Sequence, residues 1–278
     1  MEDLIIPPCD FSKVIQKLRS FFLAKGYVEV HTQNRLSILA ACEDPTTIQT
    51  YEYAGKKWPL PQTGQMWLEY ELLKNPEPKG YFCVSTSYRN EPNPVPGRHK
   101  IIFPMFEFEG KGTFDNLLQM ERELLEYLGY GKAEKVPSGD YVDMAKEYGT
   151  ESLEHEHEER LCKENGPAFL LKHFPIYTSP FWNMKWDAKE NHSKKCDVIM
   201  SGQETIGSAE RSCNKEEMRN LFNNISEGEY AQKLFDLFGE ERVKMELDEF
   251  LDLDFFPRWG GGIGVTRLIN SMKKEGLM

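Results

Sequence analysis

The chain has 278 residues, of which 40% are hydrophobic and 28% are charged, and its formal net charge is −11. These values are typical of a globular protein. The acidic balance disfavours nucleic-acid binding that depends mainly on phosphate contacts, although a local basic patch stays compatible with it. The six cysteines form no C-x-x-C pair, and no stretch approaches 18 apolar residues. We therefore expect reduced thiols, no membrane span, no signal peptide and a cytoplasmic location.

The N-terminal half predicts a helix, a strand, a strand pair and a second helix. Residues 11–24 carry an apolar stripe at helical spacing, with Asp10 as N-cap and Gly26 as the stop. Residues 27–32 have the composition of a strand. The later elements are two strands, 80–89 and 100–109, and an amphipathic helix, 115–128.

The C-terminal half alternates between helical and strand patterns. A charged helix is expected at 142–164, and the glycine run from residue 259 is expected to be a tight turn into a helix. The remaining predictions are strands at 168–174, 195–200 and 203–211, and helices at 215–223, 228–237 and 241–252. We expect one domain, residues 1–278, of the α+β class, with a mixed, mostly antiparallel sheet flanked by helices.

The loop in "YRNEPNPVPGRHKIIFPMFEFEG" is stiffened by three prolines and has cations at both ends. Arg89 ends one predicted strand, and Arg98 and His99 precede the next. Antiparallel pairing would bring these cations together, and arginine binds phosphate oxygens in a bidentate fork. The segment therefore indicates a polyphosphate site, and the alternative is a surface hairpin with solvated charges.

Two further segments point to the same chemistry. In "GGGIGVTR" the glycines allow a close backbone approach, and Arg267 follows in the first turn of a helix. A crowded helix–sheet contact would explain the glycines equally well. Asp197 and Glu204 lie seven residues apart across a turn, and their oxygens suit Mg²⁺. The alternative for this pair is two solvated carboxylates.

Together these segments resemble the catalytic core of class II aminoacyl-tRNA synthetases, in the aspartate, asparagine and lysine subgroup. "YRNE…GRH…FPMFEFE" is similar to the second family signature, "GGGIGVTRL" to the third and "FFLAKGYVEVHT" to the first, from which it departs at Gln33. The resemblance implies an antiparallel sheet flanked by helices. It also implies a homodimer through residues 11–24 and the following strand, and formation of an aminoacyl-adenylate from an amino acid, ATP and Mg²⁺.

The resemblance assigns roles to individual residues. Arg89 and Arg267 are the expected catalytic residues, Phe103 would stack on adenine, and Asp197 and Glu204 would bind Mg²⁺. The expected ATP-binding set is Arg89, Glu91, Arg98, His99, Phe103, Gly262, Gly264 and Arg267. The chain departs from the family at Ile102 and Pro104, beside the stacking position.

The expected amino-acid-binding set is Glu43, Gln62, Gln65, Glu69, Glu109 and Arg211. Arg211 matches the arginine that grips the side-chain oxygen of the substrate. Leu68 stands where aspartate-using relatives carry a lysine, which favours an amide or another neutral side chain. Glu69 follows the asparaginyl pattern and could accept from a substrate amide, or it could be a carboxylate on a helix surface.

The acceptor of the activated amino acid is the least constrained part of the prediction. The chain begins close to the first signature and has no recognisable anticodon-binding barrel, which resembles stand-alone ammonia-dependent asparagine synthetases. We therefore expect transfer to ammonia or another small acceptor. The alternatives are an asparaginyl- or aspartyl-tRNA synthetase-like enzyme acting on tRNA, and a non-catalytic nucleotide-binding paralogue.

Overall fold

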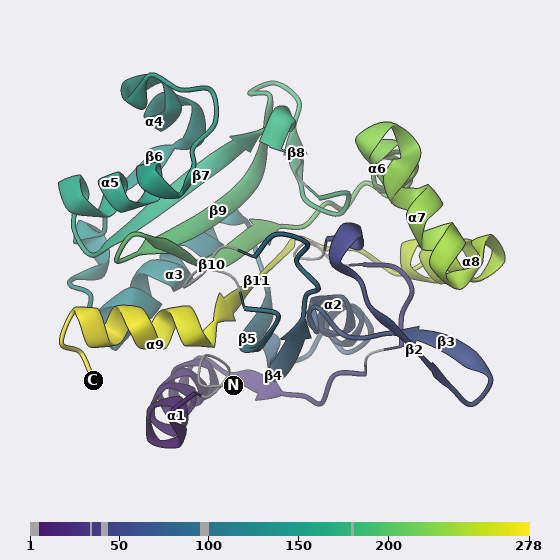
Figure 1. Ribbon diagram of the computed structural model, residues 1–278, viewed down its shortest axis with the longest axis horizontal. Helices are drawn as coiled ribbons and strands as arrows, with labels where there is room; N and C mark the ends of the chain where they lie inside the picture. Colours follow the sequence, from purple (N-terminus) through teal and green to yellow (C-terminus); the bar gives the residue numbers. More distant parts are fainter. Residues whose placement is uncertain (1–5, 34, 40–43, 95–99, 179–180) are drawn as a thin grey trace.

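A computed structural model describes residues 6–33, 35–39, 44–94, 100–178 and 181–278. Three residues that were predicted to bind substrates, Glu43, Arg98 and His99, lie outside the described residues. At the centre of the molecule is a nine-stranded sheet with the order β1-β4-β5-β11-β10-β9-β7-β6, and β8 pairs with β9 (Figure 1). The strands are β1 (Tyr27–Glu29), β4 (Gly80–Tyr88), β5 (Ile102–Lys111), β6 (Ser138–Asp140), β7 (Ala168–Pro175), β8 (Trp186–Asp187), β9 (His192–Met200), β10 (Gln203–Glu210) and β11 (Arg258–Gly264).

Most neighbouring strands are antiparallel, and only the outer pairs β1–β4 and β6–β7 are parallel. The predicted α+β class with a mixed, mostly antiparallel sheet is therefore confirmed. Strand β5 shows why one face of the sheet becomes core and the other does not. Its Phe106 and Phe108 are fully buried among apolar side chains, whereas Glu107 and Glu109 alternate with them and point to the opposite face.

Three helices cover the apolar face: α1 (Pro8–Ala24), α3 (Phe114–Leu128) and α9 (Val265–Lys274). Helix α1 begins with Pro8 in its first turn, and α3 ends at Gly129 in the left-handed conformation, so both boundaries follow the usual rules for helix ends. Phe22 of α1 stacks at 5.1 Å from both Phe106 and Phe108 of the sheet. This aromatic contact fixes α1 on the sheet.

In the part of the chain that the structure describes, helices lie over the opposite face near its two ends. They are α2 (Gln65–Lys74), which packs on β4 and β5, α4 (Tyr141–Tyr148) and α5 (His155–Asn165), which pack on β7, and α6 (Lys215–Asn224), α7 (Glu229–Phe238) and α8 (Glu240–Leu251), which form a second apolar cluster around Trp182. This face of the sheet, hereafter the site face, carries Glu107, Glu109 and Asp197 in its middle.

The structure corrects several predictions and adds further elements. The N-cap of α1 is Pro7, so Asp10, the predicted N-cap, lies in the first turn instead. The glycine run is the central strand β11 rather than a tight turn. The helix predicted at 142–164 is two helices, because Gly149 takes a left-handed φ of 70° and ends the first. The strand predicted at 27–32 ends at Glu29. Helix α2 and the hairpin of β2 (Thr50–Tyr53) and β3 (Lys56–Pro59) were not predicted.

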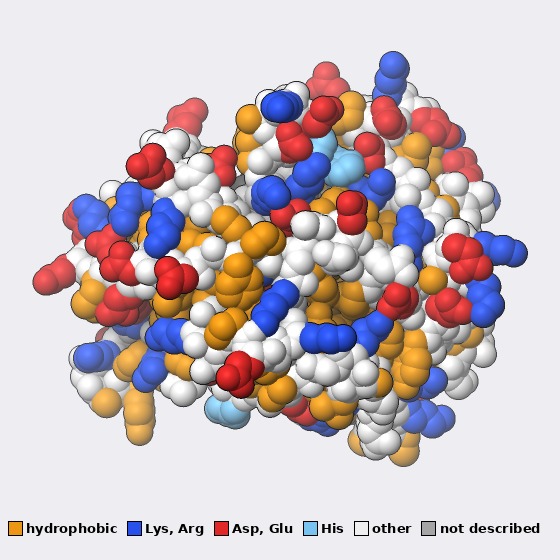
Figure 2. All heavy atoms as spheres, turned by 180° about the vertical axis from the view of Figure 1, so that it is seen from behind, with side chains coloured by type: hydrophobic (Ala, Val, Ile, Leu, Met, Phe, Trp, Pro, Cys, Tyr) orange, Lys and Arg blue, Asp and Glu red, His pale blue; other side chains and the backbone are white. Residues whose placement is uncertain are grey.

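Charged side chains of both signs are mixed over the face shown in Figure 2, with apolar patches between them. Neither acidic nor basic side chains dominate this face, although the whole chain has 45 acidic and 34 basic residues and a net charge of −11. None of the helices in the described part of the chain has the length and apolar character needed to cross a membrane.

Candidate active site

Glycines form the floor of the candidate site at the middle of the site face. Gly260 and Gly262 of β11 pair with Glu109 and Glu107 of β5, and Gly207 of β10 pairs with Asp197 of β9. Because paired residues in a sheet point to the same side, these three glycines replace side chains that would otherwise stand on the site face. Their missing side chains let neighbouring groups lie against the backbone: Glu109 over Gly260, Met105 over Gly262, and Glu204 and Asp197 beside Gly207.

Asp197 and Glu204, the predicted metal ligands, converge above Gly207. A Cβ atom placed on Gly207 would be 3.1 Å from Glu204 Oε1 and 3.7 Å from Asp197 Oδ1. The pKa of Asp197 is raised to about 7, because burial and the charge of Glu204 outweigh the lowering effect of Lys195, which lies 2.8 Å from Oδ2. Such mutual repulsion is what a bound divalent cation would relieve.

The Asp197–Glu204 pair also has spare ligand capacity. Asp197 Oδ1 is buried and has no hydrogen-bond partner among the residues that the structure describes. Within those same residues, no group of three or more His, Cys, Asp or Glu side chains could hold a metal ion. A pair of carboxylates is the donor set that suits Mg²⁺, because this ion keeps several waters and takes its other ligands from phosphates.

Arg267 lies beside the acid pair. It is in the first turn of α9, directly after the strand that contains the glycines. One guanidinium nitrogen donates to the Glu204 backbone oxygen at 2.7 Å and lies 3.8 Å from the Glu204 carboxylate. This contact places a positive charge next to the site where a metal–phosphate group would bind.

Arg89 and Phe103 meet at the end of the β4–β5 pair. The Arg89 backbone N–H donates to the Ile101 oxygen at 2.9 Å, and the guanidinium lies 5.5 Å from the centre of the Phe103 ring. The predicted phosphate-binding arginine and the predicted adenine platform are therefore neighbours. Glu91 follows Arg89 by two residues and is partly exposed.

Glu107, which the sequence analysis did not single out, organises the same end of the site. It is fully buried and accepts hydrogen bonds from the Gly64 N–H at 2.8 Å, from Ser85 Oγ at 2.5 Å and from the Thr63 hydroxyl. Burial raises the pKa of Glu107, while these donors and the nearby Arg89 lower it. The carboxylate thus ties the start of α2 to strand β5.

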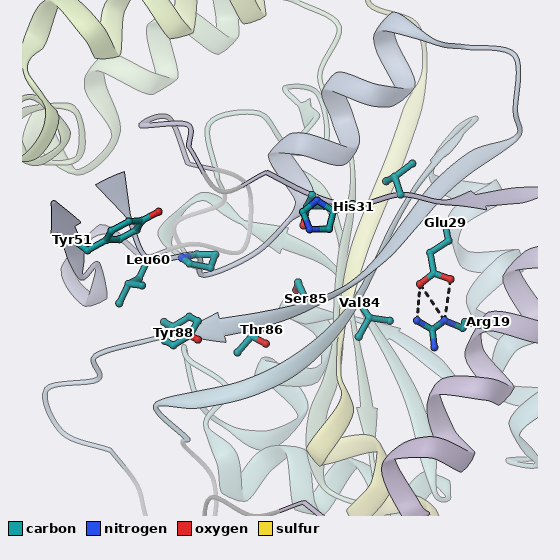
Figure 3. Close-up of a pocket in the computed structure, with 12 residues that line it drawn as sticks. Arg19, Glu29, His31, Tyr51, Leu60, Val84, Ser85, Thr86 and Tyr88 are labelled. Carbon is teal, nitrogen blue, oxygen red and sulfur yellow. Dashed lines mark hydrogen bonds and ion pairs between the residues drawn. The ribbon is translucent and has the colours of Figure 1, made fainter. Parts of the chain in front are cut away.

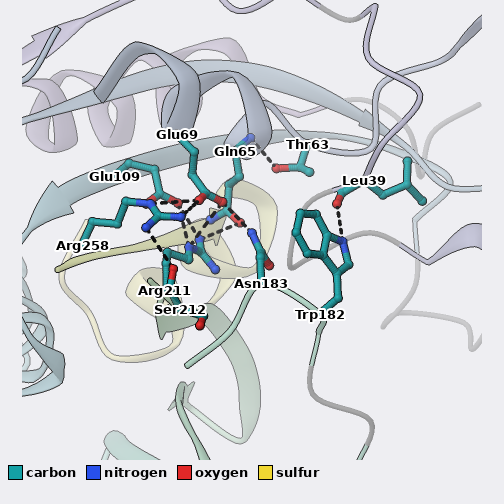
Figure 4. Close-up of polar contacts among 10 residues, drawn as sticks. All are labelled: Leu39, Thr63, Gln65, Glu69, Glu109, Trp182, Asn183, Arg211, Ser212 and Arg258. Atoms are coloured by element: carbon teal, nitrogen blue, oxygen red, sulfur yellow. Dashed lines mark hydrogen bonds and ion pairs between the residues drawn. The ribbon is translucent and has the colours of Figure 1, made fainter. Parts of the chain in front are cut away.

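Four charged side chains form a buried network between α2 and the sheet (Figure 4). Arg211 donates to Glu109 Oε1 from Nε at 3.1 Å and from a terminal nitrogen at 2.5 Å. Arg258 donates to Glu69 Oε2 at 3.1 Å and 2.7 Å. Each of the four has an exposed fraction of 1% or less. We refer to Glu69, Glu109, Arg211 and Arg258 as the charge quartet.

Glu69 is buried in the charge quartet, so the alternative that it is a carboxylate on a helix surface is wrong. Its Oε2 binds Arg258, and its Oε1 accepts from Asn183 at 2.6 Å and lies 3.7 Å from Arg211. Burial and the charge of Glu69 raise the pKa of Glu109 to about 7, although Arg211 lowers it. Arg258 and Asn183 could not be predicted as members of this network, because neither lies in a recognisable motif.

The two predicted glutamines differ in position. Gln65 Oε1 accepts from Arg211 at 3.3 Å, so Gln65 extends the charge quartet. Gln62 instead bonds the Asp44 backbone in both directions, at 2.9 and 3.1 Å, and donates to Thr47 at 2.6 Å. Gln62 therefore holds the 44–47 turn in place.

Leu68 packs in a small apolar cluster between α2 and β4. It is fully buried against Leu72, Tyr81 and Cys83. A lysine at this position would have to place its charge in that cluster or extend past it. The leucine is thus part of the packing of α2 on the sheet.

Comparisons with known proteins show the family of the chain and its fold. The family model described as tRNA synthetases class II (D, K and N) matches residues 10–276. The chain therefore belongs to the class II tRNA synthetase family of this subgroup. A comparison with curated proteins gave no significant sequence match.

Solved structures of similar fold include asparaginyl-tRNA synthetases. The enzyme from Pyrococcus horikoshii, complexed with asparaginyl-adenylate, has a TM-score of 0.76 and 20% identity over 95% of this chain and 64% of its own. The Entamoeba histolytica enzyme, also complexed with asparaginyl-adenylate, has a TM-score of 0.73 and 18% identity, over 96% of this chain and 63% of its own. A putative aspartyl-tRNA synthetase from Leishmania major Friedlin has a TM-score of 0.74 and 16% identity, over 94% of this chain and 61% of its own. The chain spans under two thirds of each neighbour, and these likenesses show the fold.

Proposed function

We propose that the chain is an ATP-dependent ligase that forms the adenylate of an aspartate- or asparagine-like amino acid. One observation carries the proposal: Asp197 and Glu204 converge over Gly207 beside Arg267, on the same sheet face as the Arg89–Phe103 contact. Three strand spacings separate β5 from β9, which is roughly 14 Å. That span suits a nucleotide triphosphate lying across the glycine floor.

In this proposal the protein positions charges and supplies no nucleophile. The carboxylate of the amino acid attacks the α-phosphorus of ATP, and pyrophosphate leaves. Arg89 would neutralise the α-phosphate and hold the attacking carboxylate, while Arg267 would stabilise the outer phosphates. Asp197 and Glu204 would hold Mg²⁺, which would neutralise the charge on the phosphates. Phe103 would support the adenine ring, with Gly262 and Gly264 allowing close approach.

Amino-acid-dependent exchange of pyrophosphate into ATP tests the proposal directly. We expect exchange with one or a few polar amino acids, and we expect Mg²⁺ to be required. Asp197→Asn should reduce exchange strongly, because it removes a charged ligand, whereas Glu121→Gln should not, because that carboxylate lies on the apolar face against Ser208. Absence of exchange with all twenty amino acids would contradict the proposal.

For the acceptor, we propose ammonia or another small nucleophile. The net charge of −11 and the mixed charges of Figure 2 support this choice over tRNA. The alternative, a tRNA-dependent enzyme, is favoured by the names of the structural neighbours. Incubation with ATP, the activated amino acid, and either ammonia or total tRNA distinguishes them, since aminoacyl-tRNA formed at a useful rate would overturn the small-acceptor proposal.

We also propose that residues 1–278 act as one catalytic domain in a cytoplasmic homodimer. Phe21 and Phe22 are both buried within the chain, so they do not supply a surface for a partner. Leu23 of α1 and Val28 of the edge strand β1 are exposed. A groove of about 840 Å³ lies beside this edge, with the Arg19–Glu29 ion pair at one end and Tyr51 and Leu60 at the other (Figure 3). A partner chain could cover both features.

A further inference from the structure

The backbone of Glu204, one of the two proposed cation ligands, lies beyond the end of the central strand pairing. Strand β10 pairs with β11 from Ile206 to Glu210, so this pairing stops before Glu204. Side chains from two helices bind the Glu204 backbone instead. Its N–H donates to Glu158 Oε2 of α5 at 3.0 Å, and its oxygen accepts from Arg267 of α9 at 2.7 Å.

We propose that Glu158 is a positioning residue for the divalent cation, because its carboxylate fixes the backbone of Glu204 and so keeps the Glu204 side chain beside Asp197. The inference rests on the proposed function, since it adds a residue to the same cation site. Glu158 acts through Glu204 and need not touch the ion. Partners of this kind, which hold a metal ligand in place, typically change metal affinity by about 10–100-fold.

An irregularity in β10 explains why the Glu204 backbone needs a support. Residues three apart in a regular strand point to opposite faces, so Glu204 and Gly207 would be separated. The register of β10 on β9 shifts between Glu204 and Ile206, and this shift lets Glu204 pair with Ile199 while Gly207 pairs with Asp197. Both carboxylates therefore reach the site face. The direction of the Glu204 side chain depends on the backbone that Glu158 holds.

Helix α5 packs against the β9–β10 hairpin and can serve as a rigid support (Figure 1). Gly202 in the turn has a left-handed φ of 92°, and a Cβ atom placed on it would be 3.1 Å from the Glu159 Cα. Cys162 Sγ donates to the Ile199 backbone oxygen at 3.6 Å. The helix that carries Glu158 is thus in contact with the same hairpin that carries the proposed cation ligands.

The Glu158 carboxylate also adds to the negative charge around the acid pair. Burial is the main reason for the raised pKa of Asp197, and the negative charges of Glu204 and Glu158 add to it. Asp197 Oδ1 is buried without a hydrogen-bond partner among the residues that the structure describes. A cation would therefore be attracted by three carboxylates while two of them bind it.

The first test measures ATP binding by calorimetry over a range of Mg²⁺ concentrations. In Glu158→Ala, the Mg²⁺ concentration for half-maximal binding should rise at least about tenfold. The affinity for ATP at saturating Mg²⁺ should stay near that of the wild-type protein, a separation that a general loss of structure would not produce. Glu158→Gln keeps an oxygen that accepts from the Glu204 N–H, so its Mg²⁺ requirement should stay within about fivefold of wild type, since a half-exposed charge contributes little.

Glu156→Ala is the matched control, because it removes an exposed carboxylate from the first turn of the same helix. It should leave the Mg²⁺ requirement unchanged.

The second test needs no ligand. Hydrogen exchange of the Glu204 amide, followed by NMR, should be at least about tenfold faster in Glu158→Ala and close to the wild-type rate in Glu158→Gln.

An unchanged Mg²⁺ requirement in a folded Glu158→Ala variant would overturn the inference without contradicting adenylate formation, as would unchanged exchange of the Glu204 amide. Equal weakening in Glu158→Ala and Glu158→Gln would also overturn it, because the charge rather than the backbone contact would then be responsible. Binding of Mg²⁺ alone that is weakened by Glu158→Ala, in a protein that binds no ATP, would support the inference and contradict the proposed function. Absence of both Mg²⁺ and ATP binding in the wild-type protein would overturn both.

Discussion

Replacing Gly260 with alanine tests the buried contact that holds Glu109 in the charge quartet. The new methyl group would overlap the Glu109 carboxylate, which must then leave Arg211. Breaking one partner away from a buried ion pair costs about 3–5 kcal/mol. Alanine offsets about 0.4–1 kcal/mol of this cost, because it lowers the conformational entropy of the unfolded chain. We therefore expect Gly260→Ala to lower the free energy of unfolding by roughly 2–4 kcal/mol.

Urea denaturation followed by tryptophan fluorescence measures this loss. Gly264→Ala is the matched control on the same strand, because the atoms nearest to its added methyl would be Arg267 side-chain carbons at 3.6–3.8 Å, an ordinary contact. Its stability should stay within about 1 kcal/mol of the wild-type protein. An equal loss in both variants, or no loss in Gly260→Ala, would refute the placement of Glu109 on the β11 backbone.

Three other changes probe the rest of the molecule. Gly207→Ala should weaken Mg²⁺-dependent ATP binding at least tenfold in calorimetry (about 1.4 kcal/mol), because its methyl would lie 3.1 Å from Glu204 Oε1 and 3.7 Å from Asp197 Oδ1; unchanged binding would remove the metal site from this position. Arg89→Ala should abolish pyrophosphate exchange without changing the circular dichroism spectrum, and an active variant would mean that the phosphate site is misassigned. Glu121→Gln should stabilise the protein at pH 8 but hardly at pH 5, as measured by thermal unfolding at both values. Burial raises the pKa of Glu121 from 4.5 to about 7, so the folded protein is more stable with this carboxyl protonated. Up to about 3 kcal/mol of the free energy of unfolding is therefore lost as the pH rises through 7, and Gln, which carries no charge, avoids this loss. Equal stabilisation at both pH values would contradict this reasoning.

The sequence could predict elements whose pattern is local. The alternation of Phe106 and Phe108 with acidic residues marks β5 and its two faces, and the stripe of α3 ends at Gly129 as expected. Strand β11 was missed because glycines have low strand propensity, and its partner β5 lies about 150 residues away in the chain. Nothing local distinguishes a glycine strand in a sheet centre from a glycine turn.

The candidate site shows the same difference between local patterns, which can be predicted, and distant contacts, which cannot. The Asp197–Glu204 spacing across one turn could be read locally, and the structure brings the two carboxylates together. Arg258 could not be found in this way, because its partner Glu69 is 189 residues distant. Helix α2 was also hidden, since Gln65, Leu68, Glu69 and Leu72 are all buried and leave no single apolar stripe.

Strand β11 lies in the middle of the sheet although it comes near the end of the chain (Figure 1). Until residues 258–264 are synthesised, no described strand pairs the β1-β4-β5 half of the sheet with the β10-β9-β7-β6 half. Folding must therefore wait for a late, non-local insertion, which is the kind of step that slows folding. The same strand carries Arg258, Gly260 and Gly262. The glycine floor and the charge quartet should consequently form together, in one cooperative event, and should be lost together when β11 is displaced.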